Sequence, residues 1–128
     1  MTLLNETMLT LEQLTDFCMD FPGTNQDFPF DTKTMVFKVS GKMFTLINVE
    51  QWMQGIERIN VKCTPTYALQ LREEYESIVP GYHMNKKHWN TLILHEGELS
   101  KELVFQLIDG SYNLVIQGLS KKERALLE

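Results

Sequence analysis

The sequence contains only two cysteines, Cys18 and Cys63, and no Cys-x-x-C pair. Their wide separation and their apolar or strand-like neighbours predict two buried, reduced thiols, and not a disulfide framework or a redox pair. A reactive cysteine needs a positive and partly exposed setting, which neither neighbourhood supplies, although Cys63 follows Lys62 directly. We therefore do not expect a catalytic cysteine.

Long apolar runs are also missing. No stretch approaches the roughly 18 residues that a membrane-spanning helix needs, and residues 1–10 lack the positive start and apolar core of a signal peptide. We therefore expect a cytoplasmic protein with no membrane partner. At 128 residues, of which 43% are hydrophobic and 23% charged, the chain has the size and balance of one folded domain spanning residues 1–128.

Signatures of catalysis and of metal binding are absent from the sequence as well. There is no Gly-x-Ser-x-Gly turn and no glycine-rich phosphate loop. His83 and His88, with His95 beyond a predicted strand, are too few and too scattered for a metal site of three or four ligands. Asp27 and Asp31 flank an aromatic loop and stay open as an acid–base pair, but capping or exposure explains them equally well. We expect no enzyme activity, no metal and no organic cofactor.

Positive charge is missing from the first 32 residues, which carry six acidic side chains and no Lys or Arg, within a net charge of −5. Residues 33–95 instead hold eight basic and five acidic residues, a balance of +3. An acidic protein is not a typical polyanion binder, but this uneven distribution allows one basic surface. An ordinary mixed surface explains the same counts.

Capping signals predict five helices, because each predicted start has a hydroxyl side chain that can accept a hydrogen bond from the backbone two or three residues later. The predicted starts are Thr10, Thr64, Ser100, Ser111 and Ser120. Pro22-Gly23 ends the first helix, and Gly110 is predicted to separate the third helix from the fourth.

Alternating apolar residues predict a sheet. The predicted strands are residues 35–39, 42–48, 58–63 and 89–94, with residues 24–33 and 49–55 as connections. Ser40-Gly41 forms the turn of a hairpin, since glycine adopts positive φ without a steric penalty. No alternating strand–helix–strand pattern occurs, so we predict an α+β fold with an antiparallel sheet flanked by helices. The expected core side chains are Leu14, Phe17, Phe37, Phe44, Leu46, Ile59, Val61, Leu71, Tyr75, Trp89, Leu92, Leu107, Tyr112 and Val115.

Residues 80–90 form the densest polar and aromatic segment of the chain, Pro-Gly-Tyr-His-Met-Asn-Lys-Lys-His-Trp-Asn. Plain connecting loops seldom combine cations, imidazoles, amides and aromatic rings in this way. Lys86 and Lys87 can neutralise phosphates, Asn85 can donate to a phosphate or a base edge, and Tyr82 can stack on a base. The structural alternative is that the aromatic residues anchor the segment in the core while the lysines are only solvated.

These segments together resemble the MmcQ/YjbR family over residues 8–124. The motifs that carry the likeness are Phe21-Pro22-Gly23-Thr24, Val36-Phe37-Lys38-Val39, Gly41-Lys42-Met43-Phe44, Ile59-Asn60-Val61-Lys62-Cys63 and, above all, residues 80–90. The resemblance implies a fold similar to the double-wing DNA-binding domain and to frataxin (CyaY-like), and it implies binding to double-stranded DNA. Fold alone does not decide function.

A nucleic-acid contact surface follows from the +3 balance of residues 33–95. Two of its basic residues flank the hairpin turn, which can act as a wing, and two share one strand face by the period of two. The predicted nucleic-acid-binding residues are Lys38, Lys42, Arg58, Lys62, Tyr82, Asn85, Lys86 and Lys87.

Two other functional classes stay open. One is a non-enzymatic module that binds a protein or peptide partner. The other is a frataxin-like iron-binding protein, in which Glu12, Asp16 and Asp20 line one face of the first helix. In each case we expect a monomer.

Overall fold

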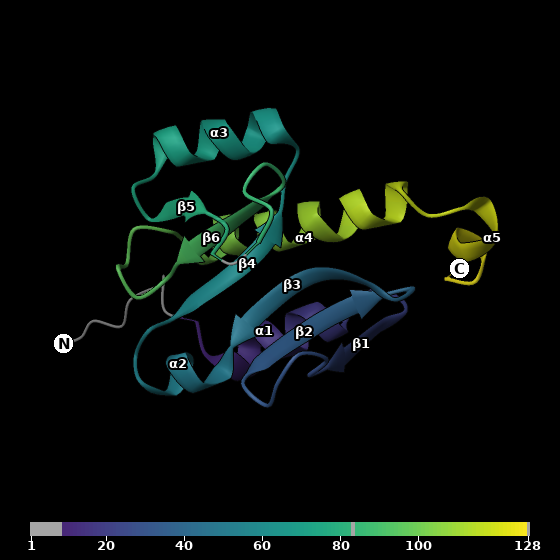
Figure 1. The fold of residues 1–128 in the computed structure, drawn as a ribbon, viewed down its shortest axis with the longest axis horizontal. Helices are drawn as coiled ribbons and strands as arrows, with labels where there is room; N and C mark the ends of the chain where they lie inside the picture. The colour runs from purple at the N-terminus through teal and green to yellow at the C-terminus, as the bar shows by residue number, and fades with distance from the viewer. Residues whose placement is uncertain (1–8, 83, 128) are drawn as a thin grey trace.

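The computed structural model describes residues 9–82 and 84–127, so His83, one of the imidazoles considered above, lies outside the described residues (Figure 1). In the N-terminal half the elements are α1 (Leu11–Met19), β1 (Thr24–Asp27), β2 (Thr34–Val39), β3 (Lys42–Asn48), α2 (Val49–Met53) and β4 (Arg58–Lys62). In the C-terminal half they are α3 (Pro65–Glu74), β5 (Ile78–Pro80), β6 (Trp89–Ile93), α4 (Lys101–Gln117) and α5 (Lys121–Ala125).

The strands form one antiparallel sheet in the order β1-β2-β3-β4-β6-β5. Helices α1 and α4 lie behind β2, β3 and β4 in Figure 1, and α4 makes its closest approach to β3 and β4. One face of the sheet is therefore covered by helices, and the opposite face, here called the open face, points toward the viewer. This is the α+β arrangement of an antiparallel sheet with flanking helices that the sequence predicts.

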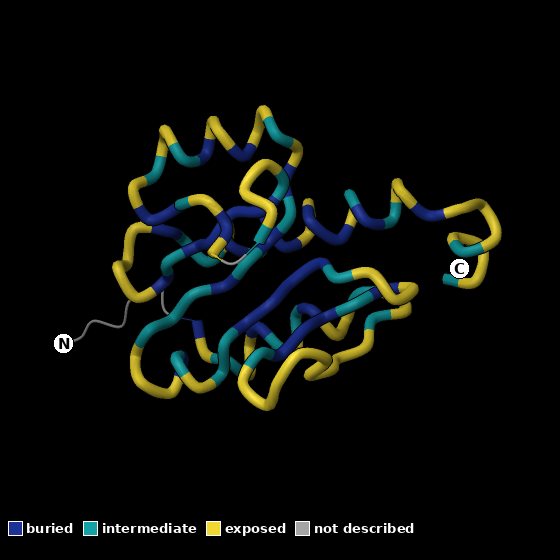
Figure 2. The backbone as a smooth tube through the Cα atoms, viewed as in Figure 1, coloured by how far each residue is buried: buried dark blue, intermediate teal, exposed yellow. Residues whose placement is uncertain are grey.

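The main core lies between the sheet and the helices. Phe37, Phe44 and Ile59 are fully buried there, and the ring of Tyr112 from α4 stacks on Phe21 with centroids 4.5 Å apart. The Tyr112 hydroxyl donates to the carbonyl of Pro22 at 2.6 Å, which satisfies its one polar atom. Figure 2 shows the result: β2 and β3 are buried, while α3 and α4 alternate between buried and exposed positions.

Nearly all expected core side chains are buried, and Phe17 and Tyr75 are half-buried against the core. The predicted hairpin is confirmed, with Ser40 and Gly41 at positive φ in its turn. The capping boxes at Thr10 and Ser120 are both present.

Three local predictions are wrong. Residues 24–27, predicted as part of a connection, form the edge strand β1. Residues 78–80 form a short strand, β5, for which the sequence gives no alternation signal. Residues 49–53 form α2, because Asn48 caps them and Trp52 is buried. Helix α4 continues through Gly110, since burial of Leu107 and Ile108 before it and of Ser111 and Tyr112 after it outweighs the roughly 1 kcal/mol helix cost of glycine.

Ser111 does not cap a second helix. Its hydroxyl lies inside α4, donates to the carbonyl of Phe44 at 2.6 Å and accepts from the amide of Lys62 at 2.8 Å. The Ser111 side chain therefore joins α4 to β3 and β4. The sequence predicts a helix cap at this position, and the structure shows a tertiary contact instead.

Candidate functional site

The open face carries a row of four facing side chains across β2, β3, β4 and β6. Val36 faces Leu46, Leu46 faces Asn60, and Asn60 faces Thr91. The row thus changes from apolar to polar along its length. Val36 and Leu46 form a second, small apolar cluster with Trp89, against which Met43 and Met84 pack.

A hollow of about 720 Å³ lies over this row. Its volume is in the range of small-molecule pockets, roughly 300–1,000 Å³. The connection between β1 and β2 contributes Phe30 to one side, and the connection between β5 and β6 contributes Tyr82 to another; the two rings are 65% and 59% exposed. The residues that line it, here called the hollow, are Phe30, Asp31, Thr34, Met43, Leu46, Asn48, Gln51, Arg58, Asn60, Tyr82, Met84, Asn85 and Thr91.

Backbone hydrogen bonds hold the 80–90 segment against the sheet. Gly81 donates to the carbonyl of Trp89 at 2.8 Å, and Cys63, at the end of β4, donates to the carbonyl of His88 at 2.7 Å. The amide of Tyr82 donates to the hydroxyl of Thr91 at 3.0 Å. Gly81 also packs so closely that a Cβ atom there would lie 2.8 Å from Cβ of Trp89. The described part of the segment, residues 80–82 and 84–90, therefore forms a wall of the hollow.

Arg72 of α3 is a further anchor of this wall. Its Nε donates to Oδ1 of Asn90 at 2.7 Å, and its Nη2 donates to the carbonyls of Lys86 and Trp89. Asn90 in turn donates to the carbonyl of Ala68, so one arginine and one buried amide connect α3 to the segment. Sequence reasoning counted Arg72 among the basic residues, and the structure gives it a supporting role.

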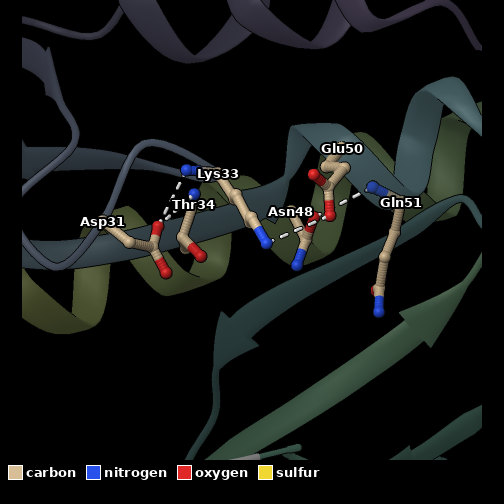
Figure 3. A network of polar contacts seen from close by, with 6 residues as sticks. All are labelled: Asp31, Lys33, Thr34, Asn48, Glu50 and Gln51. Carbon is tan, nitrogen blue, oxygen red and sulfur yellow. Dashed lines mark hydrogen bonds and ion pairs between the residues drawn. The ribbon is translucent and has the colours of Figure 1, made fainter.

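The rim near β2 and α2 is stabilised by local polar contacts (Figure 3). The backbone N–H groups of Lys33 and Thr34 donate to Oδ1 of Asp31 at 2.9 and 2.8 Å, and they lower the pKa of that carboxyl. The Lys33 ammonium lies 3.4 Å from a carboxylate oxygen of Glu50. Both acidic groups are thus already engaged within the protein.

Three asparagine side chains in the hollow use their carbonyl oxygens for internal support. Oδ1 of Asn48 accepts from the amide of Gln51 at 2.9 Å, and Oδ1 of Asn85 accepts from the amide of Lys87 at 2.9 Å. The Thr91 hydroxyl donates to Oδ1 of Asn60 and accepts from the backbone N–H of Tyr82. The backbone N–H donors therefore fix which end of the Asn48 and Asn85 amides is the oxygen.

Arg58 lies at the start of β4 and is half-buried. Its Nε atom is buried without a hydrogen-bond partner among the described residues. A buried donor left unpaired costs about 1–3 kcal/mol. Arg58 also lines the hollow, where it is the one positively charged side chain of the described lining.

The structure brings three of the eight predicted nucleic-acid-binding residues, Arg58, Tyr82 and Asn85, into the hollow. Lys86 and Lys87 are exposed on the same segment, where Nζ of Lys86 donates to the carbonyl of Gly81 at 3.2 Å. Their role in binding stays a prediction.

The other three lie elsewhere. Lys38 forms an ion pair with Asp27 at 3.5 Å. Lys42 lies near α5, where hydrogen bonds with Ser120 lower the pKa of Glu123 and the charge of Lys42 lowers it further. Lys62, at the end of β4, lines a separate hollow of about 260 Å³ beside α3 and α4. None of these three lysines lines the hollow with Arg58, and their role in binding stays a prediction.

Several polar residues of the lining, including Thr34, Asn48 and Gln51, carried no functional signal in the sequence. The strand alternation around Arg58 placed Asn60 on the exposed face but did not show which residues face it. Only the pairing of β3, β4 and β6 brings them together.

The residues considered for a metal site or for acid–base chemistry do not assemble into a site in the described part of the chain. Among the described residues, no group of three or more His, Cys, Asp or Glu side chains is placed to hold a metal ion. Asp27, considered for acid–base chemistry, accepts from the amide of Phe28 at 2.8 Å in addition to its ion pair. Within residues 9–82 and 84–127, no helix has the length and apolar character needed to cross a membrane.

The chain belongs to the YjbR family, whose model matches residues 19–114. It is 40% identical to the uncharacterised protein YbdF of Escherichia coli O157:H7 over 106 residues, covering 83% of this chain and 84% of that protein. It is 29% identical to the uncharacterised YjbR of Escherichia coli K12 over 119 residues, covering 93% and 98%. The crystal structure of Deinococcus radiodurans DR2400, a DUF419 protein, matches with a TM-score of 0.85 and 38% identity, covering 97% of this chain and 91% of that one.

Proposed function

We propose that this chain is a non-catalytic protein that binds nucleic acid through the open face of its sheet. The observation that carries the proposal is the convergence of Arg58, Tyr82 and Asn85 on the hollow. A cation, an aromatic ring and an amide are the groups that proteins use to contact phosphates, bases and base edges.

The local charge supports this proposal more than the net charge of −5 does. The carboxylates of Glu50 and Asp27 are neutralised by Lys33 and Lys38. The acidic helix α1 lies on the opposite side of the sheet from the open face (Figure 1). A polyanion at the hollow therefore meets Arg58 and the nearby lysines of the 80–90 segment, and the one carboxylate of the lining, Asp31, is held by backbone N–H groups.

The test is a salt titration of binding to labelled DNA, followed by fluorescence anisotropy. Duplex and single-stranded forms of one sequence are compared between about 50 and about 200 mM salt. We expect the logarithm of the association constant to fall linearly with the logarithm of salt concentration for at least one form, because phosphate contacts release counterions. No binding of either form at about 50 mM salt would contradict the proposal.

A protein or peptide module is the second candidate, and one observation favours it. Phe30 and Tyr82 are large, exposed rings beside an apolar floor that includes Leu46, and such rings are common anchors at protein interfaces. Absence of nucleic-acid binding in the salt titration would make this the better proposal.

A further inference from the structure

The polar side chains of the hollow present many hydrogen-bond donors. Because the oxygens of Asn48, Asn60 and Asn85 are engaged within the protein, each leaves its NH₂ group without a partner among the described residues. Arg58 adds a guanidinium whose Nε is unpaired. Four side chains of the lining thus offer donors to a ligand.

Acceptors are scarce in the same lining. The Asp31 carboxylate takes two backbone N–H groups and the Thr34 hydroxyl. The Thr91 hydroxyl donates to Asn60 and accepts from Tyr82. The carbonyl of the Gln51 amide has no partner among the described residues and can accept a hydrogen bond, and Figure 3 shows the amide ends of Asn48 and Gln51 pointing the same way.

The shape and apolar surface of the hollow suit a flat ring. Its floor includes Leu46, Met43 and Met84, and the exposed ring of Phe30 lies at its edge. Aromatic side chains stack on nucleobases with a free energy of about 1–3 kcal/mol per base. A planar ligand rich in acceptors therefore matches both the polar and the apolar parts.

Among nucleobases, thymine and uracil have the pairing edge that this lining matches best, because one N–H donor lies between two carbonyl acceptors. The amide NH₂ groups can donate to the two carbonyls, and Gln51 can accept the single donor. Adenine, cytosine and guanine also carry acceptors, but each has an amino group on this edge, which would face the donors of the hollow. An unmatched buried donor lowers affinity.

We propose that the hollow binds one unpaired thymine or uracil base of a single strand, an inference that rests on the proposed nucleic-acid-binding function. The base must be unpaired, because pairing in a duplex occupies its ring N–H and one carbonyl. The neighbouring phosphates then lie toward Arg58 and the lysines of the 80–90 segment.

The first experiment compares labelled oligothymidine, oligoadenosine and oligocytidine, each about 12 nucleotides long, with a thymidine–adenosine duplex. We expect oligothymidine to bind at least about fivefold more tightly than the other three, the lower limit for hydrogen-bond discrimination between bases. The preference should persist at raised salt, because base contacts release no counterions.

The second experiment uses variants that keep the internal hydrogen bonds. Asn48→Asp and Asn85→Asp retain the oxygen that accepts from the backbone, and each replaces a free NH₂ group with an acceptor. The matched control is Asn113→Asp on the exposed side of α4, which adds the same charge away from the hollow. We expect the thymidine preference to fall in the first two variants and to persist in the control.

A ring deletion tests the stacking step. Phe30→Ala should weaken binding of oligothymidine by about fivefold or more. Phe28→Ala, which removes a ring that is 42% exposed and not part of the hollow, should leave binding nearly unchanged. Thermal unfolding of every variant confirms that the fold is retained.

The failures of the two proposals are distinguishable. Equal, salt-sensitive affinity for all three single strands, or tighter binding to the duplex, would overturn the base proposal and leave nucleic-acid binding standing. Binding to an acidic peptide with none to any oligonucleotide would overturn both.

Discussion

At the scale of single residues, an asparagine side chain of the open face can stabilise the fold with its oxygen and present its NH₂ group to a ligand. Asn48 caps α2 with its oxygen and leaves its nitrogen toward the hollow. Asn85 stabilises the 80–90 segment in the same manner. Fixed amides lose little conformational entropy on binding, so they are well suited to recognise a ligand.

The cysteines give the first prediction at this scale. Burial raises the pKa of Cys18 to about 12 and that of Cys63 to about 11, and the thiolate is the reactive form. At about pH 8, a chromogenic disulfide reagent should therefore modify neither thiol in the folded protein and both after unfolding. Rapid modification of either thiol under native conditions would contradict the buried positions.

The same pKa shifts determine how the free energy of unfolding changes with pH. A folded-state pKa above the ordinary value of 9.0 favours the protonated thiol, so its contribution is complete below about pH 9. The contribution is lost as pH rises toward the folded-state values. The measurement is thermal unfolding of the Cys18→Ala variant, which keeps Cys63, across this pH range. Comparison with the unsubstituted protein separates the larger pKa shift, that of Cys18, from the smaller one of Cys63.

At the scale of elements, the continuity of α4 through Gly110 predicts the effect of adding a methyl group. A Cβ at Gly110 would meet no atom within 4 Å, so Gly110→Ala should raise the free energy of unfolding by about 0.5–1 kcal/mol. Gly81→Ala is the contrasting variant, because its Cβ would lie 2.9 Å from the carbonyl oxygen of Trp89. We expect it to lower the free energy of unfolding by about 1–3 kcal/mol. Urea unfolding measures both.

The anchoring of the 80–90 segment by Arg72 gives the next prediction. Arg72→Ala removes donors to Asn90 and to the carbonyls of Lys86 and Trp89, so it should lower the free energy of unfolding by about 2–3 kcal/mol. Arg72→Lys should recover only part of this, since an ammonium cannot reproduce the planar donor arrangement. Arg124→Ala, an exposed arginine of α5, is the control and should change stability by less than about 0.5 kcal/mol. An equally small change in the free energy of unfolding for Arg72→Ala would show that the 80–90 segment does not depend on Arg72.

Elements with strong local signals could be predicted from the sequence, and elements that depend on distant contacts could not. The capping box of α1 and the turn of the β2–β3 hairpin are local, and both are confirmed. The strand β1 is polar throughout and exists because it pairs with β2. The hollow likewise depends on long-range pairing, since Asn60 and Thr91 are far apart in the chain and face each other only across β4 and β6.

At the scale of the whole molecule, the sheet separates two unlike sides. Helix α1, which carries Glu12 and Asp16, lies with α4 on one side, and the hollow lies on the other (Figure 1). Such a separation keeps the acidic side chains of α1 away from the open face in a protein of net charge −5. A binding surface for an anionic ligand on this molecule therefore has to be local, and removing a few cations should be enough to weaken it.

The paired substitution Lys86→Ala and Lys87→Ala tests that requirement. Both lysines are exposed beside the hollow, so their loss should weaken nucleic-acid binding by a similar factor for every sequence and flatten the salt slope by up to about two units. Folding should be nearly unchanged, because exposed lysines contribute little stability. The matched control is the other lysine pair, Lys121→Ala with Lys122→Ala, on α5 at the opposite end of the molecule from β5 and β6 (Figure 1).

The two double variants carry the same change in net charge, so comparison between them separates local contact from overall charge. If only the Lys86 and Lys87 variant loses affinity and salt dependence, the 80–90 segment contacts phosphate. Equal losses in both variants would indicate a long-range effect of net charge, which salt screens over roughly 10 Å at 0.1 M. Unaltered affinity in a folded Lys86 and Lys87 variant would remove this segment from the binding surface and leave Arg58 as the cation of the hollow.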